Sequence, residues 1–128
     1  PEINLGLIPG FGGSQRLLRL AGRSATLELC LLGSPITAAR AHGLGIVNEV
    51  VAADALDARV DELATQLAKA APLALRAILD SVLLGGECAL EQGLEFESTQ
   101  FGLVFSTADM REGTSAFLER RKPEFVGQ

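Results

Sequence analysis

Hydrophobic residues recur at helical spacing along most of the chain. After a glycine-rich opening, GSQRLLRLAG predicts a short helix that ends at Gly22, since glycine readily adopts the left-handed conformation that closes a helix. RSATLELCLLG predicts a second helix with Ser24 as its N-cap and Gly33 as its end. Thr37 is expected to cap a third, AARAH, which ends at Gly43. The pattern thus predicts a compact layer of short helices.

The segment GIVNEVV predicts the only strand. Its β-branched residues, Ile46, Val47, Val50 and Val51, are bracketed by small residues, which is typical of a strand. A single strand cannot satisfy its own backbone hydrogen bonds. We therefore expect this strand to need a sheet or a neighbour that this sequence does not contain.

The remainder of the chain is predicted to be helical. Asp54 is expected to cap a long helix with a narrow apolar stripe. Pro72 suits the first position of the next helix, which Gly85 and Gly86 are expected to end.

Two more helices are expected before the chain ends. One covers about residues 89–105 and contains two glycines, each of which is expected to weaken it by up to about 1 kcal/mol relative to alanine. The last covers about residues 109–121, with Asp109 and Glu112 at the spacing of a capping box.

Composition narrows the class of protein. The 128 residues predict one domain, and 48% are apolar, enough for a core built from Leu, Ala, Val and Ile. A net charge of −5 argues against general nucleic-acid binding, and no apolar run has the length of a membrane helix. The single histidine excludes a metal site built on a histidine cluster. Cys30 and Cys88, two isolated cysteines, suggest a reducing compartment, and no leader sequence is visible.

Candidate chemistry lies in the opening stretch, PEINLGLIPGFGGSQRLL. By position alone, Glu2 is best explained as a solvated carboxylate. GFGG is not a dinucleotide-binding fingerprint, because Gln15 stands where the third glycine is needed, and no P-loop lysine follows. The pattern indicates a tight turn into a helix N-terminus, whose free N–H groups suit an anion or a polar oxygen.

A second candidate is a basic cluster near the end of this acidic chain. Taken alone, the cluster is typical of a solvated helix end, where cations also complement the helix dipole. Its members are Arg111, Arg120, Arg121 and Lys122.

Longer stretches carry a more specific signal. The chain resembles the crotonase superfamily of enoyl-CoA hydratases and isomerases in PEINLGLIPGFGGSQRLLRLAG, in LLGSPITAARAHGLGIVNEVV and in STADMREGTSAFLERRKPEF. The resemblance covers essentially all of the sequence. It implies an α/β spiral fold of stacked ββα turns, followed by a helical region that trimerises. This chain resembles the C-terminal half of such a subunit, mainly α with one or few strands: residues 1–52 would end the spiral core, and residues 53–128 would form the helical trimerisation region.

The resemblance also implies a set of site residues. Glu2 aligns with the catalytic glutamate of the family's Pro-Glu dipeptide, which exchanges a proton with the substrate's α-carbon. Gly10 aligns with the glycine whose backbone N–H helps to hold the attacking water. Phe101 and Phe117 would lie near the pantetheine or adenine of coenzyme A, and Arg120 near a phosphate, where lysine is usual. The oxyanion hole and a second, water-activating glutamate are expected upstream.

The function implied by this resemblance is hydration of a 2-enoyl-CoA thioester in a cytoplasmic enzyme. The alternatives are an enoyl-CoA isomerase and a non-catalytic fragment that acts only in assembly. Coenzyme A belongs to the substrate, so no separate cofactor and no metal are expected. The expected partners are the acyl-CoA and copies of the same chain in a homotrimer or a dimer of trimers, with no nucleic acid and no membrane. The 128 residues alone are expected to be inactive.

Overall fold

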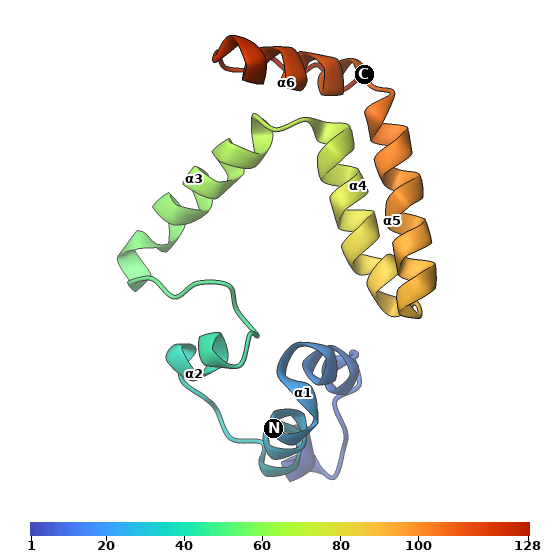
Figure 1. Ribbon diagram of the computed structural model, residues 1–128. Helices are drawn as coiled ribbons and strands as arrows, with labels where there is room; N and C mark the ends of the chain where they lie inside the picture. Colours follow the sequence, from blue (N-terminus) through green and yellow to red (C-terminus); the bar gives the residue numbers. More distant parts are fainter. The chain divides into compact units, whose positions relative to one another are not determined.

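The computed structural model describes all of residues 1–128 and divides the chain into two compact units (Figure 1). Unit 1 comprises Pro1–Leu56, and unit 2 comprises Asp57–Gln128. Helices form the regular structure of both units, and no strand is present. No helix combines the length and hydropathy of a membrane span.

The main helix of unit 1 is α1 (Gly13–Leu32), which is broken in the middle. Gly22 has φ 75° and ψ 173°, so the predicted end of a first helix there is confirmed as a break between two helical stretches. The hydrogen bond across this break comes from Thr26, whose hydroxyl donates to the Gly22 carbonyl oxygen at 2.8 Å, rather than from the expected cap Ser24. Gly33 ends α1 in the left-handed conformation, as predicted.

Two shorter elements flank α1 along the chain. The 3-10 helix η1 (Glu2–Leu5) precedes it, and α2 (Ala38–Gly43) follows it. The predicted N-cap of α2 is confirmed, because the Thr37 hydroxyl accepts a hydrogen bond from the Arg40 N–H at 3.2 Å. Caps of this kind are decided by residues three positions apart, which is why the sequence alone was sufficient.

The predicted strand GIVNEVV is wrong as a description of this chain. Residues 46–48 form bends and residues 49–52 have no regular structure, so no ladder of strand hydrogen bonds is present. The only regular feature is at the start, where the Ile46 N–H donates to the Ala41 carbonyl oxygen at 2.9 Å and closes the turn after α2. A strand exists only with a hydrogen-bonding neighbour, and none of the 128 residues supplies one.

The connection to unit 2 also corrects an expected cap. Asp54 lies within a short 3-10 helix, η2 (Ala53–Ala55), so it does not cap the long helix. That helix, α3 (Leu56–Ala68), begins directly after η2.

Unit 2 is built around a helical hairpin in which α4 (Pro72–Leu83) and α5 (Leu90–Phe105) lie side by side (Figure 1). The proline at the first position of α4 is confirmed. The 3-10 helix η3 (Gly85–Glu87) forms the corner. The corner is tight, because a Cβ added at Gly93 would lie 2.9 Å from the Gly85 carbonyl oxygen. The two elements therefore meet backbone to backbone.

The last helix, α6 (Ala108–Glu119), begins differently from the prediction. Its N-cap is Thr107, whose hydroxyl accepts a hydrogen bond from the Met110 N–H at 3.1 Å. The expected capping box of Asp109 and Glu112 is wrong, because both side chains hold the chain that follows α6. Tertiary contacts override the local pattern here.

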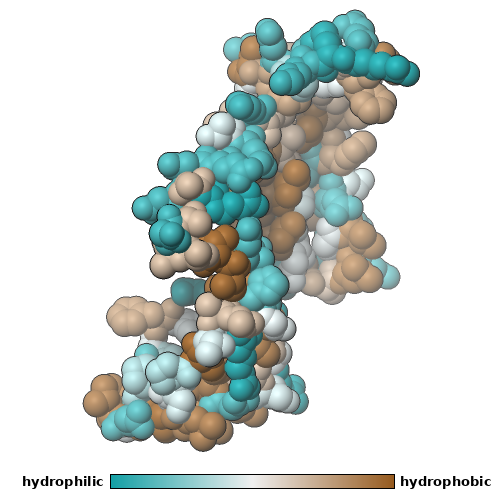
Figure 2. All heavy atoms as spheres, turned by 90° about the vertical axis from the view of Figure 1, so that its left-hand side faces the viewer, coloured by the Kyte–Doolittle hydropathy of each residue, from teal (hydrophilic) through white to brown (hydrophobic).

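The core is smaller than the composition predicts. The buried hydrophobic residues are alanines, at positions 25, 77 and 116, and no large side chain is fully buried. Large hydrophobic residues are exposed instead, and Figure 2 shows them in brown among hydrophilic neighbours. Phe11, for example, is 95% exposed, and Phe117 is 81% exposed. The apolar faces that the sequence marks are real, but this chain does not cover them.

Candidate functional site

The candidate catalytic residue Glu2 lies in η1 of unit 1, which the left-handed Gly6 (φ 69°) closes. The Glu2 side chain is 42% exposed, and its carboxylate lies 3.1 Å from the N-terminal ammonium of Pro1. A hydrogen bond from its own backbone N–H lowers the pKa of Glu2 from the usual 4.5. The group is therefore a carboxylate at neutral pH, which can accept a proton.

Glu2 lines a hollow of about 370 Å³ formed by η1 and both ends of α1. η1 packs closely against the end of α1, since a Cβ added at Gly33 would lie 2.9 Å from the Ile3 Cγ2. The free thiol of Cys30 lines the same hollow. The sequence did not reveal Cys30 as a site residue, because it falls on an apolar helix face that is also typical of a core position.

Gly10 lies in the exposed loop between η1 and α1. A Cβ at Gly10 would meet no atom within 4 Å, and the adjacent Phe11 projects into solvent. Gly12 then turns the chain in the left-handed conformation (φ 80°), and α1 begins at Gly13 without a side-chain cap. The predicted tight turn into a helix N-terminus is confirmed; the water-holding role of Gly10 stays a prediction.

The candidate coenzyme A residues Phe101 and Phe117 lie in unit 2. Phe101, on α5, contacts Phe105, with the ring centroids 5.8 Å apart. It lines a mainly apolar hollow of about 240 Å³ between α4 and α5, together with Ile78 and Val104. Phe117 lies on α6 and does not line that hollow. The geometry therefore brings Phe101, but not Phe117, to this hollow.

Arg120 directly follows α6 in an uncommon conformation. With φ 55° it is the only residue other than glycine with a positive φ. Its N–H donates to the Phe117 carbonyl oxygen at 3.3 Å, and the next N–H, of Arg121, donates to the Ala116 carbonyl oxygen at 3.0 Å. The Arg120 side chain is exposed and takes part in no ion pair. Its guanidinium is thus available to an anion.

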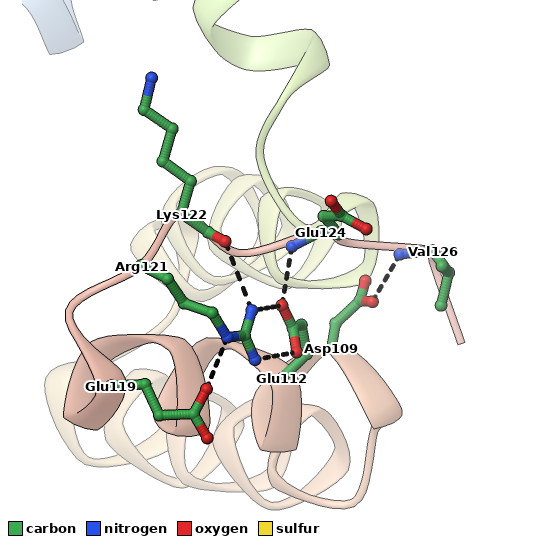
Figure 3. Close-up of polar contacts among 7 residues, drawn as sticks. All are labelled: Asp109, Glu112, Glu119, Arg121, Lys122, Glu124 and Val126. Atoms are coloured by element: carbon green, nitrogen blue, oxygen red, sulfur yellow. Dashed lines mark hydrogen bonds and ion pairs between the residues drawn. The ribbon is translucent and has the colours of Figure 1, made fainter.

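Arg121, by contrast, is held by two carboxylates (Figure 3). Its two terminal nitrogens lie 2.5 and 2.9 Å from the two oxygens of Glu112, and its Nε lies 2.6 Å from Glu119. The hydrogen bonds from Arg121 and from the Glu124 N–H lower the pKa of Glu112 from 4.5 to about 2. The same carboxylates raise the pKa of Arg121. Of the basic cluster, Arg121 is therefore a structural residue.

Carboxylates also hold the tail, residues 122–128, back against α6 (Figure 3). Asp109 is 2% exposed, and its two oxygens accept the N–H groups of Val126 and Gly127 at 2.7 and 2.9 Å. Glu112 accepts the N–H of Glu124 at 2.8 Å. The sequence marked Asp109 and Glu112 but could not reveal this role, because their partners lie 12 to 18 residues further along the chain.

The sequence-predicted site residues thus fall into two sets. Glu2 and Gly10 lie in unit 1, whereas Phe101, Phe117 and Arg120 lie in unit 2. No group of three or more His, Cys, Asp or Glu side chains is placed to hold a metal ion.

Comparison with known proteins identifies the family. The model of the enoyl-CoA hydratase/isomerase family matches residues 1–128. The chain is 41% identical over 128 residues to a 2,3-dehydroadipyl-CoA hydratase of Escherichia coli K12, covering all of this chain and 50% of that protein. It is 44% identical over 117 residues to a short-chain-enoyl-CoA hydratase of Clostridioides difficile, covering 91% of this chain and 76% of that protein.

Solved structures agree. The crystal structure of an enoyl-CoA hydratase from Bacillus anthracis matches with a TM-score of 0.96 and 36% identity, covering 99% of this chain and 49% of that one. The chain spans about half the length of the E. coli relative and of this crystal structure. The match over all 128 residues nevertheless shows that the chain belongs to the enoyl-CoA hydratase/isomerase family.

Proposed function

We propose that the protein is part of an enoyl-CoA hydratase, which adds water across the double bond of a 2-enoyl-CoA thioester. The observation that carries the proposal is the family match over the whole chain, with relatives named as hydratases of acyl-CoA substrates. The Glu2 carboxylate beside a hollow and a glycine-rich turn is compatible with this chemistry.

In the proposed mechanism, Glu2 exchanges a proton with the α-carbon of the substrate, a role typically worth about 10²–10⁴-fold in rate. The backbone N–H of Gly10 helps to hold the water. The oxyanion hole and a second glutamate would come from the remainder of the subunit. The substrate carries its own coenzyme A, so the proposal includes no separate cofactor.

Phe101, Phe117 and Arg120 are proposed to contact coenzyme A. Both phenylalanines are exposed, 68% and 81%, so their rings are accessible to pantetheine or adenine. Arg120 is proposed to bind a phosphate through its unpaired guanidinium. Arginine can make two parallel hydrogen bonds to a phosphate, which suits this role.

The chain is proposed to act within an assembly of identical subunits, a trimer or a dimer of trimers. The support is the uncovered apolar surface of α5 and α6, where Leu90 is 77% exposed and Leu118 is 75% exposed. Surfaces of this kind usually pack against a partner. The sequence resemblance supports the proposal that the chain is the C-terminal half of the subunit. The resemblance and the two free cysteines support the proposal that the protein is cytoplasmic.

Hydration of crotonyl-CoA, followed as loss of its enoyl absorbance, tests the proposal. A subunit that joins this chain to the remainder of the enzyme should be active, and Glu2→Gln should lower kcat by at least about 100-fold. The 128 residues alone should be inactive. Unchanged activity of the Glu2→Gln subunit would refute the assignment of Glu2.

The same assay separates the alternatives. An isomerase would shift the double bond of a 3-enoyl-CoA and form no 3-hydroxyacyl-CoA from crotonyl-CoA. If the chain acts only in assembly, it should form oligomers. The joined subunit should then catalyse neither hydration nor isomerisation.

A further inference from the structure

The conformation of Arg120 requires an explanation. L-residues rarely adopt the left-handed region, because the side chain then crowds the backbone. Arg120 does so at φ 55° and ψ 37°, as the residue that directly follows α6. Glycine would be the usual residue here. Arginine at this position therefore needs support from its surroundings.

A carboxylate of α6 that contacts the chain directly after the turn is the candidate for this support. Glu112, on α6, binds Arg121 through both of its carboxylate oxygens and also accepts a hydrogen bond from the N–H of Glu124. One carboxylate thus fixes two points of the chain that leaves the left-handed turn. This restricts the direction in which the chain can continue after Arg120.

The same contacts also determine which arginine is neutralised. Glu112 and Glu119 are the carboxylates that pair with Arg121. Because Arg121 occupies both, neither competes for Arg120, whose guanidinium has no partner. Figure 3 shows Arg121 enclosed by these two carboxylates. Two adjacent arginines therefore have opposite environments, one paired and one open.

We propose that Glu112 is a positioning residue for Arg120: by holding Arg121 and the following segment, it keeps Arg120 left-handed with its guanidinium open to a phosphate of coenzyme A. The inference rests on the proposed function, in which Arg120 binds that phosphate. Glu112 does not touch the ligand and acts only through the turn.

Positioning and simple electrostatics predict opposite signs for the change Glu112→Gln. The substitution removes a negative charge close to an anion-binding group, so electrostatics alone would tighten anion binding. Loss of the support for Arg120 would weaken it. Glu119→Gln is the matched control, because it removes the same charge from the same neighbourhood but leaves the two-oxygen contact between Glu112 and Arg121 intact.

The experiment is a titration of the protein and its variants with coenzyme A and, separately, with pantetheine, which lacks the phosphates. Arg120→Ala should weaken coenzyme A binding by about tenfold, the value of one charge-assisted hydrogen bond. Glu112→Gln should weaken it by about threefold, while Glu119→Gln should not weaken it. Pantetheine affinity should be unchanged in all three, which a general structural defect would not allow.

A double variant isolates the coupling. In the Arg120→Ala background, Glu112→Gln should have no further effect on coenzyme A affinity. Arg121→Lys serves as a second test if Glu112→Gln does not fold, because it keeps the charge and loses the two-oxygen contact. It should weaken coenzyme A binding by a similar factor.

The outcomes separate this inference from the proposed function. If Arg120→Ala leaves coenzyme A affinity unchanged, the phosphate-binding role of Arg120 is wrong, and this inference fails with it. If Arg120→Ala weakens binding but Glu112→Gln and Arg121→Lys do not, or weaken it equally in the Arg120→Ala background, only the positioning role is overturned.

Discussion

The opening of unit 1 and the end of unit 2 are both surface segments that carry candidate site residues, yet they are held in different ways. Residues 1–12 turn at left-handed glycines and make backbone hydrogen bonds to near neighbours, while Ile8 and Phe11 are 80% and 95% exposed. Residues 120–128 are tied by the carboxylates of Asp109 and Glu112.

The difference shows which of the two segments is held by contacts within its own unit. In the tail of unit 2, three N–H groups have carboxylate acceptors within the unit, which fixes the path of the chain after Arg120. The opening of unit 1 leaves the large apolar side chains of Ile8 and Phe11 exposed, so fewer contacts within the unit fix this segment. Four changes test this comparison.

The largest effect is expected from Asp109→Ala. The change leaves the N–H groups of Val126 and Gly127 without their acceptor at a buried position, which should lower the free energy of unfolding by about 3 kcal/mol. Urea denaturation measures it. Asp61→Ala, an exposed site in the same unit, and Glu2→Ala, in the opening, should change stability little. An equal loss in Glu2→Ala would contradict the comparison.

A second effect concerns close packing in unit 2. Gly93→Ala should lower stability by about 2 kcal/mol, because the new methyl group meets the Gly85 carbonyl oxygen. Gly102→Ala, on the same helix with open space around it, should raise stability by up to about 1 kcal/mol. Thermal unfolding of both variants checks the opposite signs. If both were stabilising, the corner would not be as tight as described.

The N-caps of α2 and α6 allow a comparison of the two units, because in each a threonine hydroxyl accepts a backbone N–H. Thr107→Ala and Thr37→Ala should each cost about 1 kcal/mol locally. Amide hydrogen exchange reports this at the donors, since the N–H groups of Met110 and Arg40 should each exchange about fivefold faster. If the Arg40 N–H already exchanged freely in the parent protein, α2 would lack the cap in solution.

The smallest effect on stability is expected from lowering the pH, because Glu112 lies near the surface and solvent screens its ion pair with Arg121. Its pKa is about 2 in the folded protein and 4.5 without its partners. The contribution of Glu112 to stability is therefore complete above pH 4.5 and is lost as the pH falls toward 2. Urea denaturation across this range should show a weaker pH dependence in Glu112→Gln. An identical profile would show that Glu112 does not hold the tail.

The features that the sequence predicted correctly are helix ends and caps, which depend on residues close together in the chain. The break at Gly22, the end at Gly33, the Thr37 cap and the proline that begins α4 depend on residues within one turn, and all four are confirmed. Within one helical turn, the residue types themselves determine the structure, for example where a glycine adopts a positive φ or a threonine accepts a free N–H.

What the sequence could not predict depends on distant partners. The strand at residues 46–51 needs a neighbouring strand, which the chain does not contain. Asp109 and Glu112 have a spacing that satisfies a local rule, yet they bind a segment far along the chain. At the site, the motif marked Glu2 and the turn at Gly10, but neither the hollow that Glu2 lines nor the pairing of Arg121 was visible in it.

The tight corner between α4 and α5 also has a consequence for the order of folding. Its contacts join elements that are adjacent in sequence, so little chain entropy is lost before they form. Structures with such local contacts fold within microseconds to milliseconds. The hairpin would therefore form early during synthesis. Residues 122–128 would dock later, because the Asp109 carboxylate can bind only after residues 126 and 127 have been made.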